Sequence, residues 1–329
     1  MKNISLYTLQ GIACMFIVFI HCDFPGQLGE IVNTIARFAV PIFFMVSGYF
    51  NYSASKEKLK SRVLKLIKIF IISSILYITY NNFENLYINN KHNFIEYNLA
   101  KLSLQNIFNL VVFNFTYFIY SHLWFILALM YCYIFRILTK DKKVEKTYKY
   151  IPILIIVGYI LNIYLLKKGL NMVYLTRNWI LMGVPFYILG HLIKEKTDKI
   201  AKTSKLKIIL FAIVGLVLSV VERLILKSNN IWRLEIYIGS IIFAVSIFIL
   251  AVKEPKLIDI KIFRVIGEKY SLNIYIIHYL IADILKKVVI NKFNININGY
   301  ILPIVVFIIS YIFSLIIYKL QEVIKLREN

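Results

Sequence analysis

Long apolar stretches alternate with short polar, mostly basic segments along the whole chain. About ten of these stretches are roughly 17–25 residues long, which is the length that an α-helix needs to cross the hydrocarbon core of a membrane. The pattern therefore predicts an all-α, polytopic membrane protein with about ten transmembrane helices. The predicted spans lie near residues 5–22, 31–52, 63–82, 121–138, 150–166, 178–193, 206–226, 234–252, 270–290 and 300–320.

The first predicted span carries polar residues on one side. Gln10 and His21 are eleven residues apart, which is three helical turns plus about 20°, so both project from one face about 16 Å apart. Cys14 lies on the same face. A histidine within hydrocarbon is costly and rare. We therefore expect this face to point into the helix bundle or a cavity, and His21 is a functional candidate.

The positions of the basic residues predict how the helices are oriented. If the N-terminus is placed inside the cell, most of the 39 lysines and arginines fall in the inner segments, and every inner segment is a basic cluster. Positive charge is enriched in cytoplasmic loops. The sequence therefore predicts that both termini are cytoplasmic and that the basic loops face anionic lipid headgroups.

Composition narrows the class of protein further. Of the 329 residues, 60% are apolar and the net charge is +22, and the mean hydropathy of +0.71 exceeds that of ordinary soluble proteins. Since no long polar stretch occurs, a single integral membrane domain over residues 1–329 is expected. The regular spread of charge over the loops explains the basic balance without a nucleic-acid partner. The cysteine and histidine spacings predict no metal site and no disulfide framework.

Two polar groups are predicted near the outer surface. Arg37 lies about six residues, or about 9 Å, into the second predicted span, and His21 is expected near the same level. An arginine at depth needs a partner or a water-filled cavity. An imidazole beside a guanidinium would suit a general base with an anion clamp. A snorkelling arginine and a hydrogen-bonded core histidine explain the same residues equally well.

A basic row opens the third predicted span on the inner side. Arg62, Lys65 and Lys68 are spaced so that they share one helix face. Such a row could hold the phosphates of a nucleotide or of coenzyme A. Because every inner segment is basic, the residues taken alone favour a plain topology signal.

The ninth predicted span also carries polar residues on one face. Ser271, Tyr275 and His278 share that face, and Asp283 follows deeper along the helix. An aspartate and a histidine in a membrane could form a proton relay, and they could equally be structural hydrogen-bonding groups. Trp124, at the outer start of the fourth span, is interpreted as an interfacial anchor, with stacking against a sugar as the alternative.

Two further features leave alternatives open. The predicted outer loop near 83–120 could hold an interfacial helix over 102–118 or be an ordinary loop. Val40-Pro41 leading to Gly48 is echoed by Val184-Pro185 leading to Gly190. This echo could reflect an internal duplication, but the shared composition of membrane helices explains it more simply.

Four stretches, in order along nearly the whole chain, resemble the membrane acyltransferase-3 family. This family consists of bacterial enzymes that transfer acyl groups to envelope and exported carbohydrates. The matching stretches are Leu9-Gln10-Gly11-Ile12-Ala13 running to His21, Ala39 to Phe50, His122-Leu123-Trp124-Phe125, and Ile266-Gly267-Glu268-Lys269-Tyr270-Ser271-Leu272 with Tyr275 and His278. The family has a basic residue where this chain has Gln10, so the charge at that position is lost while hydrogen bonding is kept.

The resemblance implies roles for several residues. The donor would be a cytoplasmic acyl-CoA, most simply acetyl-CoA, and His21 would be the catalytic histidine, acting as a base or taking the acyl group itself. Arg37 would steady the carbonyl or an anionic acceptor. Arg62 and Lys65 match the basic pair of the family at the start of helix 3 and would hold the CoA phosphates. The expected substrate-binding residues are Trp124, Ser271 and His278.

We therefore expect an O-acyltransferase of the bacterial plasma membrane that modifies an envelope or exported glycan, with no metal and no nucleic acid involved. Other acyl groups and amine acceptors remain alternatives within this class. A polytopic transporter or flippase for a lipid-linked sugar is the rival from another class, because a polar face and outer arginines would suit it too. A structural subunit of a polysaccharide-synthesis complex is a third reading.

Overall fold

The computed structural model describes residues 2–88, 101–139, 144–231, 233–292 and 297–328. All regular secondary structure in these ranges is helical, which confirms the all-α prediction. Among the described residues, seven helical segments are long and apolar enough to cross a membrane, so the chain is a multi-pass membrane protein. These segments are Ile4–His21, Gly26–Phe50, Lys56–Tyr87, Ser121–Leu138, Tyr148–Lys167, Lys205–Ser228 and Leu302–Val323.

Three of the predicted spans are helical but shorter or interrupted. The span near 234–252 is α13 (Ile238–Lys253), which has 16 residues. The spans near 178–193 and 270–290 are broken by π-helices, in which an extra residue per turn shifts the hydrogen-bonding register. They consist of η5 (Trp179–Gly183) with α10 (Val184–Glu195), and of η6 (Ile266–Tyr270), α15 (Ser271–Asp283) and η7 (Ile284–Lys292). The count of ten spans and their orientation therefore stay predictions.

The chain divides into two compact units, and each is described by itself. The first unit consists of residues 1–43, 196–228 and 236–329, and the second of residues 44–195 and 229–235. The helix α3 (Ala39–Phe50) contributes its first five residues to the first unit and the rest to the second.

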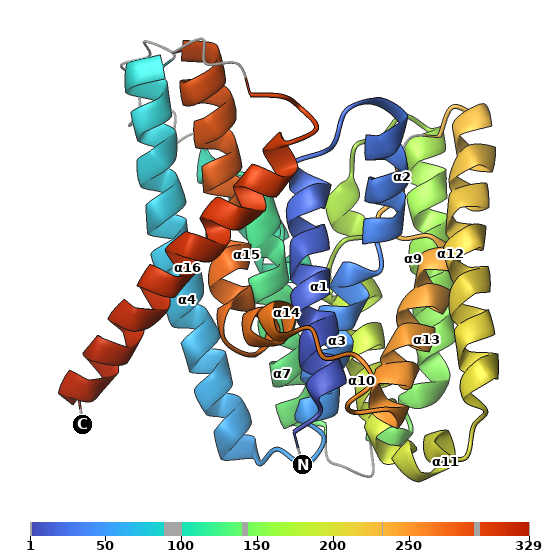
Figure 1. Cartoon of the computed structure of the whole chain (residues 1–329). Coiled ribbons are helices and arrows are strands. Elements are labelled where there is room, and N and C mark those ends of the chain that lie inside the picture. Colours follow the sequence, from blue (N-terminus) through green and yellow to red (C-terminus); the bar gives the residue numbers. More distant parts are fainter. Residues whose placement is uncertain (1, 89–100, 140–143, 232, 293–296, 329) are drawn as a thin grey trace. The chain divides into compact units, whose positions relative to one another are not determined.

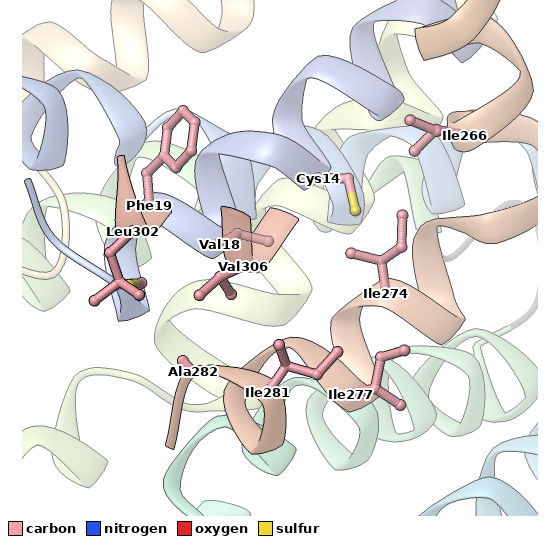
Figure 2. Packing of buried hydrophobic residues seen from close by; sticks show 11 residues of the cluster. Cys14, Val18, Phe19, Ile266, Ile274, Ile277, Ile281, Ala282, Leu302 and Val306 are labelled. Carbon is pink, nitrogen blue, oxygen red and sulfur yellow. The ribbon is translucent and has the colours of Figure 1, made fainter. Parts of the chain in front are cut away.

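The first unit is built around α1 (Ile4–His21), which packs against α14 (Lys261–Val265), η6 and α15 (Figure 1). The Asn3 side chain caps the start of α1 by accepting a hydrogen bond from the backbone N–H of Leu6 at 2.8 Å. The helix α16 (Leu302–Glu328) packs along α15. Figure 2 shows the apolar side chains that fill this part of the core, from α1, η6, α15 and α16.

The same unit contains a second helix group. The helix α2 (Gly26–Ala36) begins after Pro25, and α12 (Lys205–Ser228) packs against both α2 and α13. The short helix α11 (Thr197–Ala201) precedes α12. Many apolar side chains of α12 point outward, among them Phe211 at 62% exposure, which is the surface that a lipid-facing helix presents.

Two glycines bring the backbone of α1 into contact with α14 and η6. A Cβ atom on Gly11 would lie 1.9 Å from the carbonyl oxygen of Phe263, and one on Gly267 would lie 2.0 Å from that of Tyr7. Any larger residue at either position would overlap with backbone atoms, so only glycine fits. Both glycines belong to the stretches that resemble the acyltransferase family, and this contact explains why those positions need glycine.

The second unit is a helical bundle in which α4 (Lys56–Phe83) packs against α7 (Trp124–Leu138). The helix α4 buries Leu59, Leu66 and Tyr77 and exposes Ile72 and Ile75, so it has one protein-facing and one outward apolar side. The other helices of this unit are η1 (Glu84–Ile88), α6 (Leu104–Phe113), η2 (Ser121–Leu123), η3 (Tyr148–Tyr150), α9 (Ile151–Lys167) and η4 (Val173–Leu175), besides η5 and α10.

The two echoing proline segments pack against each other. A Cβ atom on Gly48 of α3 would lie 1.8 Å from the carbonyl oxygen of Tyr187, and one on Gly190 of α10 would lie 2.1 Å from that of Met45. The two helices therefore cross at their glycines, where small residues allow close approach. The sequence echo thus marks a pair of helices in mutual contact.

A helix occurs in the predicted outer loop. The helix α6 begins at the Ser103 cap, whose Oγ accepts a hydrogen bond from the N–H of Asn106 at 3.2 Å, and it ends at Asn114 in a left-handed conformation. Residues 89–100 of that loop lie outside the described residues, as do residues 140–143 of the third predicted inner basic segment.

Candidate functional site

The polar face of α1 points at α15, as the sequence predicts for a face turned into the bundle. The Gln10 Nε2 donates to the Ser271 Oγ at 3.2 Å, and the Cys14 Sγ lies 3.7 Å from the Ser271 carbonyl oxygen. Ser271 is buried and also donates to the carbonyl oxygen of Gly267 at 3.4 Å. The neutral amide of Gln10 thus makes a hydrogen bond between the two helices. Glutamine can still donate this bond although it lacks the charge of the basic residue that the family has at this position.

His21 lies at the C-terminal end of this face, in the last turn of α1. The centroid of its ring is 5.2 Å from that of His278 and 5.1 Å from that of Tyr279. Its side chain is partly exposed rather than buried. His21 therefore combines contact with a second histidine and access from outside the core.

His278 is fully buried, and its neighbours fix its tautomer. Its Nδ1 is 2.7 Å from the carbonyl oxygen of Tyr275 and 3.2 Å from that of Ile274. A carbonyl oxygen only accepts hydrogen bonds, so the Nδ1 carries the proton and the Nε2 carries the lone pair. The ring is thus held in one orientation by its own helix. Sequence analysis identified His278 but missed Tyr279, because Tyr279 lies outside the polar face on which the search was based.

In the first unit, a series of hydrogen bonds between side chains holds Arg37. Its Nη2 and Nε donate to the Asn33 Oδ1 at 2.8 Å and 3.2 Å, and the Asn33 Nδ2 donates to the Asp23 Oδ1 at 2.8 Å. Sequence analysis missed Asn33 and Asp23, although Asn33 and Arg37 have the i, i+4 spacing that puts side chains in contact on a helix. Asp23 follows His21 by two residues, so these hydrogen bonds link Arg37 to the segment just after the histidine.

The depth predicted for Arg37 was based on a helix start that is wrong. The helical segment begins at Gly26 instead of near residue 31, and Arg37 forms the turn between α2 and α3. Arg37 is therefore eleven residues into the segment, about 16 Å along it instead of about 9 Å. The apolar pattern begins late because Gly26, Gln27 and Glu30 are polar or small, while Pro25 marks the structural start.

Asp283 is paired on its own helix. Its Oδ2 lies 3.0 Å from the Nζ of Lys287, one turn further along. This contact favours the structural reading of Asp283 over the proton relay, because a lysine partner accounts for its carboxylate.

Arg62 and Lys65 lie in the second unit, on the first turns of α4. The Ser55 side chain caps this helix by accepting a hydrogen bond from the Lys58 N–H at 3.3 Å. Arg62 is half-buried and interacts electrostatically with Tyr133 and Tyr187, whereas Lys65 is exposed.

Trp124 is buried in the second unit, so its interpretation as an exposed interfacial anchor is wrong. Its side chain is only 6% exposed. The guanidinium carbon of Arg177 lies 5.7 Å from the centroid of its ring, within the range of a cation–π contact. Arg177 is also paired with Glu235 at 3.7 Å. Periodicity cannot distinguish a tryptophan at the membrane interface from one covered by a neighbouring loop, which explains the error.

A further ion pair lies at the start of the chain. Lys2 forms an ion pair with Glu268, and this hydrogen-bonded carboxylate raises the pKa of the lysine. Within the described ranges, no group of three or more histidine, cysteine or acidic side chains could hold a metal ion. All three cysteines are buried free thiols.

The comparisons with known proteins give the class of this chain. The family model described as an acyltransferase domain matches residues 3–319, which includes most of both compact units. A serine/alanine racemase of Enterococcus gallinarum is 30% identical over 91 residues, which cover 24% of this chain and 13% of that protein.

An amino-acid racemase of Enterococcus faecalis is 28% identical over 218 residues, which cover 60% of this chain and 29% of that protein. The chain thus spans less than a third of the length of the curated relatives that it matches. No solved structure matches it. Because the family model covers nearly the whole chain, the chain belongs to the membrane acyltransferase-3 family.

Proposed function

We propose that this membrane acyltransferase moves an acyl group, most simply acetyl, from cytoplasmic acyl-CoA to a hydroxyl of an envelope or exported glycan. The observation that carries the proposal is the pair of histidine rings, His21 and His278, at the end of the contact between α1 and α15. The bacterial plasma membrane is the proposed location, with both termini in the cytoplasm.

His21 is the proposed general base. Its imidazole takes the proton of the acceptor hydroxyl while the hydroxyl oxygen forms a bond to the carbonyl carbon of the thioester. The carbon–sulfur bond then breaks, and the imidazolium returns the proton to the CoA thiolate. What supports this role is the partial exposure of His21 and the contact of its ring with that of His278.

His278 and Ser271 are the proposed partners of this base on α15. His278 is held as the Nδ1–H tautomer, so it presents a neutral lone pair at Nε2 and would orient either the ring of His21 or the acceptor hydroxyl. Ser271 holds Gln10 and would fix the distance between the two helices.

Arg37 is the proposed clamp for negative charge. Asn33 orients the guanidinium, whose permanent positive charge can stabilise a developing oxyanion or an anionic acceptor. Trp124 is a proposed contact for the acceptor sugar, through the edge of a ring whose face is covered by Arg177.

Arg62 and Lys65 are the proposed holders of the CoA phosphates. A guanidinium binds phosphate through two parallel hydrogen bonds, while a lysine supplies charge without that fork. In the proposed orientation this row is at the cytoplasmic side and His21 is near the outer side. The proposal therefore requires that the acyl group travels between them, carried by the pantetheine arm or by a relay.

The test is transfer of radiolabelled acetyl from acetyl-CoA by the full-length protein in membrane vesicles. The acceptor is an envelope glycan preparation, and free serine is a second acceptor because a relative is a serine/alanine racemase. We expect label on the glycan and a loss of at least about 100-fold in His21→Ala. Membrane levels and the elution profile of the variant are measured alongside, to exclude a folding defect.

Two outcomes would contradict the proposal. If His21→Ala transfers label at the wild-type rate, the histidine is not the base. If a sugar substrate crosses the vesicle membrane without becoming labelled, the chain acts as a transporter for that substrate instead.

A further inference from the structure

A cavity of about 180 Å³ lies between α2 and α12 in the first unit, away from the contact between α1 and α15. Four residues of each helix line it, from Gln27 to Thr34 on α2 and from Val220 to Lys227 on α12. On both helices the lining positions follow the i, i+3, i+4, i+7 spacing of a single face. Two complete helix faces therefore form this groove.

The groove carries charge at its base and at its mouth. Arg223 is 4% exposed and lies 3.7 Å from the Glu30 carboxylate. Lys227 lies 2.8 Å from the same carboxylate, with its side chain 51% exposed. The lining residues thus supply two positive charges and one negative charge, a sum of +1. An anion with a single charge would neutralise this sum.

The groove also has an apolar side at the membrane surface. Gln27 is next to the first residue of α2, and Lys227 is next to the last residue of α12, in segments apolar enough to span a membrane. The groove is therefore at one end of both segments, at the depth of lipid headgroups. Ile31 and Leu224 line it and remain 45% and 60% exposed, so an apolar chain beside the groove would contact them.

We propose that this groove binds the phosphate of an anionic phospholipid, with Arg223 and Lys227 as its ligands and the acyl chains against Ile31 and Leu224. A guanidinium donates two parallel hydrogen bonds to phosphate, and the lysine adds a charge at the mouth. Glu30 holds both cations in place and sets the charge of the groove at +1, which selects a singly charged headgroup. The apolar rim favours a lipid over free phosphate. This site does not depend on the proposed acyl transfer.

The experiment uses the full-length protein in detergent, and its thermal unfolding is followed as phosphatidylglycerol, phosphatidylcholine or inorganic phosphate is added. Binding to the folded state raises the unfolding temperature. We expect phosphatidylglycerol to raise it, the zwitterionic phosphatidylcholine to raise it less, and inorganic phosphate to leave it unchanged. Lys227→Gln should weaken phosphatidylglycerol binding about tenfold, as loss of a charged hydrogen bond does.

The control is Lys207→Gln, a lysine at the other end of the same helix, which should bind phosphatidylglycerol like the wild type. Glu30→Gln raises the charge of the lining residues to +2, so it should bind phosphatidylglycerol more tightly, and a damaged fold cannot produce that gain. The proposal is overturned if Lys227→Gln and Lys207→Gln respond alike, if Glu30→Gln binds more weakly, or if inorganic phosphate alone reproduces the shift.

Discussion

At the residue scale, the site depends on how two histidines differ. His278 is fully buried and its Nδ1 proton is committed to carbonyl groups of its own helix, whereas His21 is partly exposed at a helix end. Of the two rings, His21 is the one that a substrate can reach. The buried ring is suited to orienting its neighbour.

This difference predicts unequal effects of substitution. His278→Asn should reduce kcat by about tenfold, less than His21→Ala, and should leave the KM for acyl-CoA nearly unchanged, because orientation and not donor binding is lost. Steady-state kinetics on the purified protein measure both constants. An increase in KM at constant kcat would assign His278 to binding instead.

The residues that sequence reasoning missed share a physical cause. The polar face of α1 could be predicted from spacing alone, and so could the facing residues Ser271 and His278, because helix geometry fixes which side chains project together. Asn33 and Asp23 belong to a turn, and the burial of Trp124 depends on Arg177, far away along the chain. Such contacts arise from tertiary packing, which leaves no periodic signal in the sequence.

At the element scale, glycines determine how closely the helices approach. The backbone of α1 contacts that of α14 at Gly11 and that of η6 at Gly267, and α3 contacts α10 at Gly48 and Gly190. The sequence shows Gly48 and Gly190 in two similar segments, but it does not show that these segments contact each other. The π-helices η5, η6 and η7 could not be predicted, because the shift in hydrogen-bonding register is imposed by packing and not by local residue preference.

Gly11→Ala should destabilise the protein by about 1–3 kcal/mol or more, because the new methyl group would overlap with the Phe263 carbonyl oxygen. Gly158→Ala in α9 is the matched control. Its Cβ would lie 3.4 Å from the nearest atom, so the substitution should be neutral or slightly stabilising, as alanine favours helix. Thermal unfolding in detergent compares the two. Equal stability of the two variants would contradict the close contact.

The first turns of α4 carry the proposed donor site, and a substitution series separates it from a topology signal. Arg62→Gln and Lys65→Gln should each raise the KM for acyl-CoA several-fold with little change in kcat, because phosphate contacts bind the donor without taking part in the reaction. Lys60→Gln, on another face of the same helix, is the control. If the KM for acyl-CoA is the same in all three variants, Arg62 and Lys65 do not bind the donor and serve only as a topology signal.

At the scale of the whole molecule, the family match extends across both compact units, while the residues proposed for chemistry are divided between them. His21, Arg37, Ser271 and His278 belong to the first unit, and the proposed donor-binding residues to the second. The all-α, multi-pass class followed directly from the long apolar stretches. The number of spans did not, because α13 and α15 are shorter than the membrane thickness requires of a single straight helix.

The predicted orientation can be tested with introduced cysteines, since the three native thiols are buried. Ser204→Cys should react only with a reagent that reaches the cytoplasm, and Asn171→Cys should react from outside in intact cells. Mass-tag labelling with an impermeant maleimide distinguishes the two sides. Labelling of position 204 in intact cells would reverse the proposed topology.

The backbone contact between Gly11 and Gly267 has a consequence for how this sequence can change. His21 follows Gly11 by ten residues, and His278 follows Gly267 by eleven. The number of residues between each glycine and its histidine therefore determines whether the two rings meet. Inserting a single residue into either length would rotate its imidazole by about 100° and advance it by about 1.5 Å. The hydropathy of the helix would hardly change, but the rings of His21 and His278 would no longer be in contact. Descendants of this chain can exchange apolar residues along these helices freely, but they cannot lengthen one without the other.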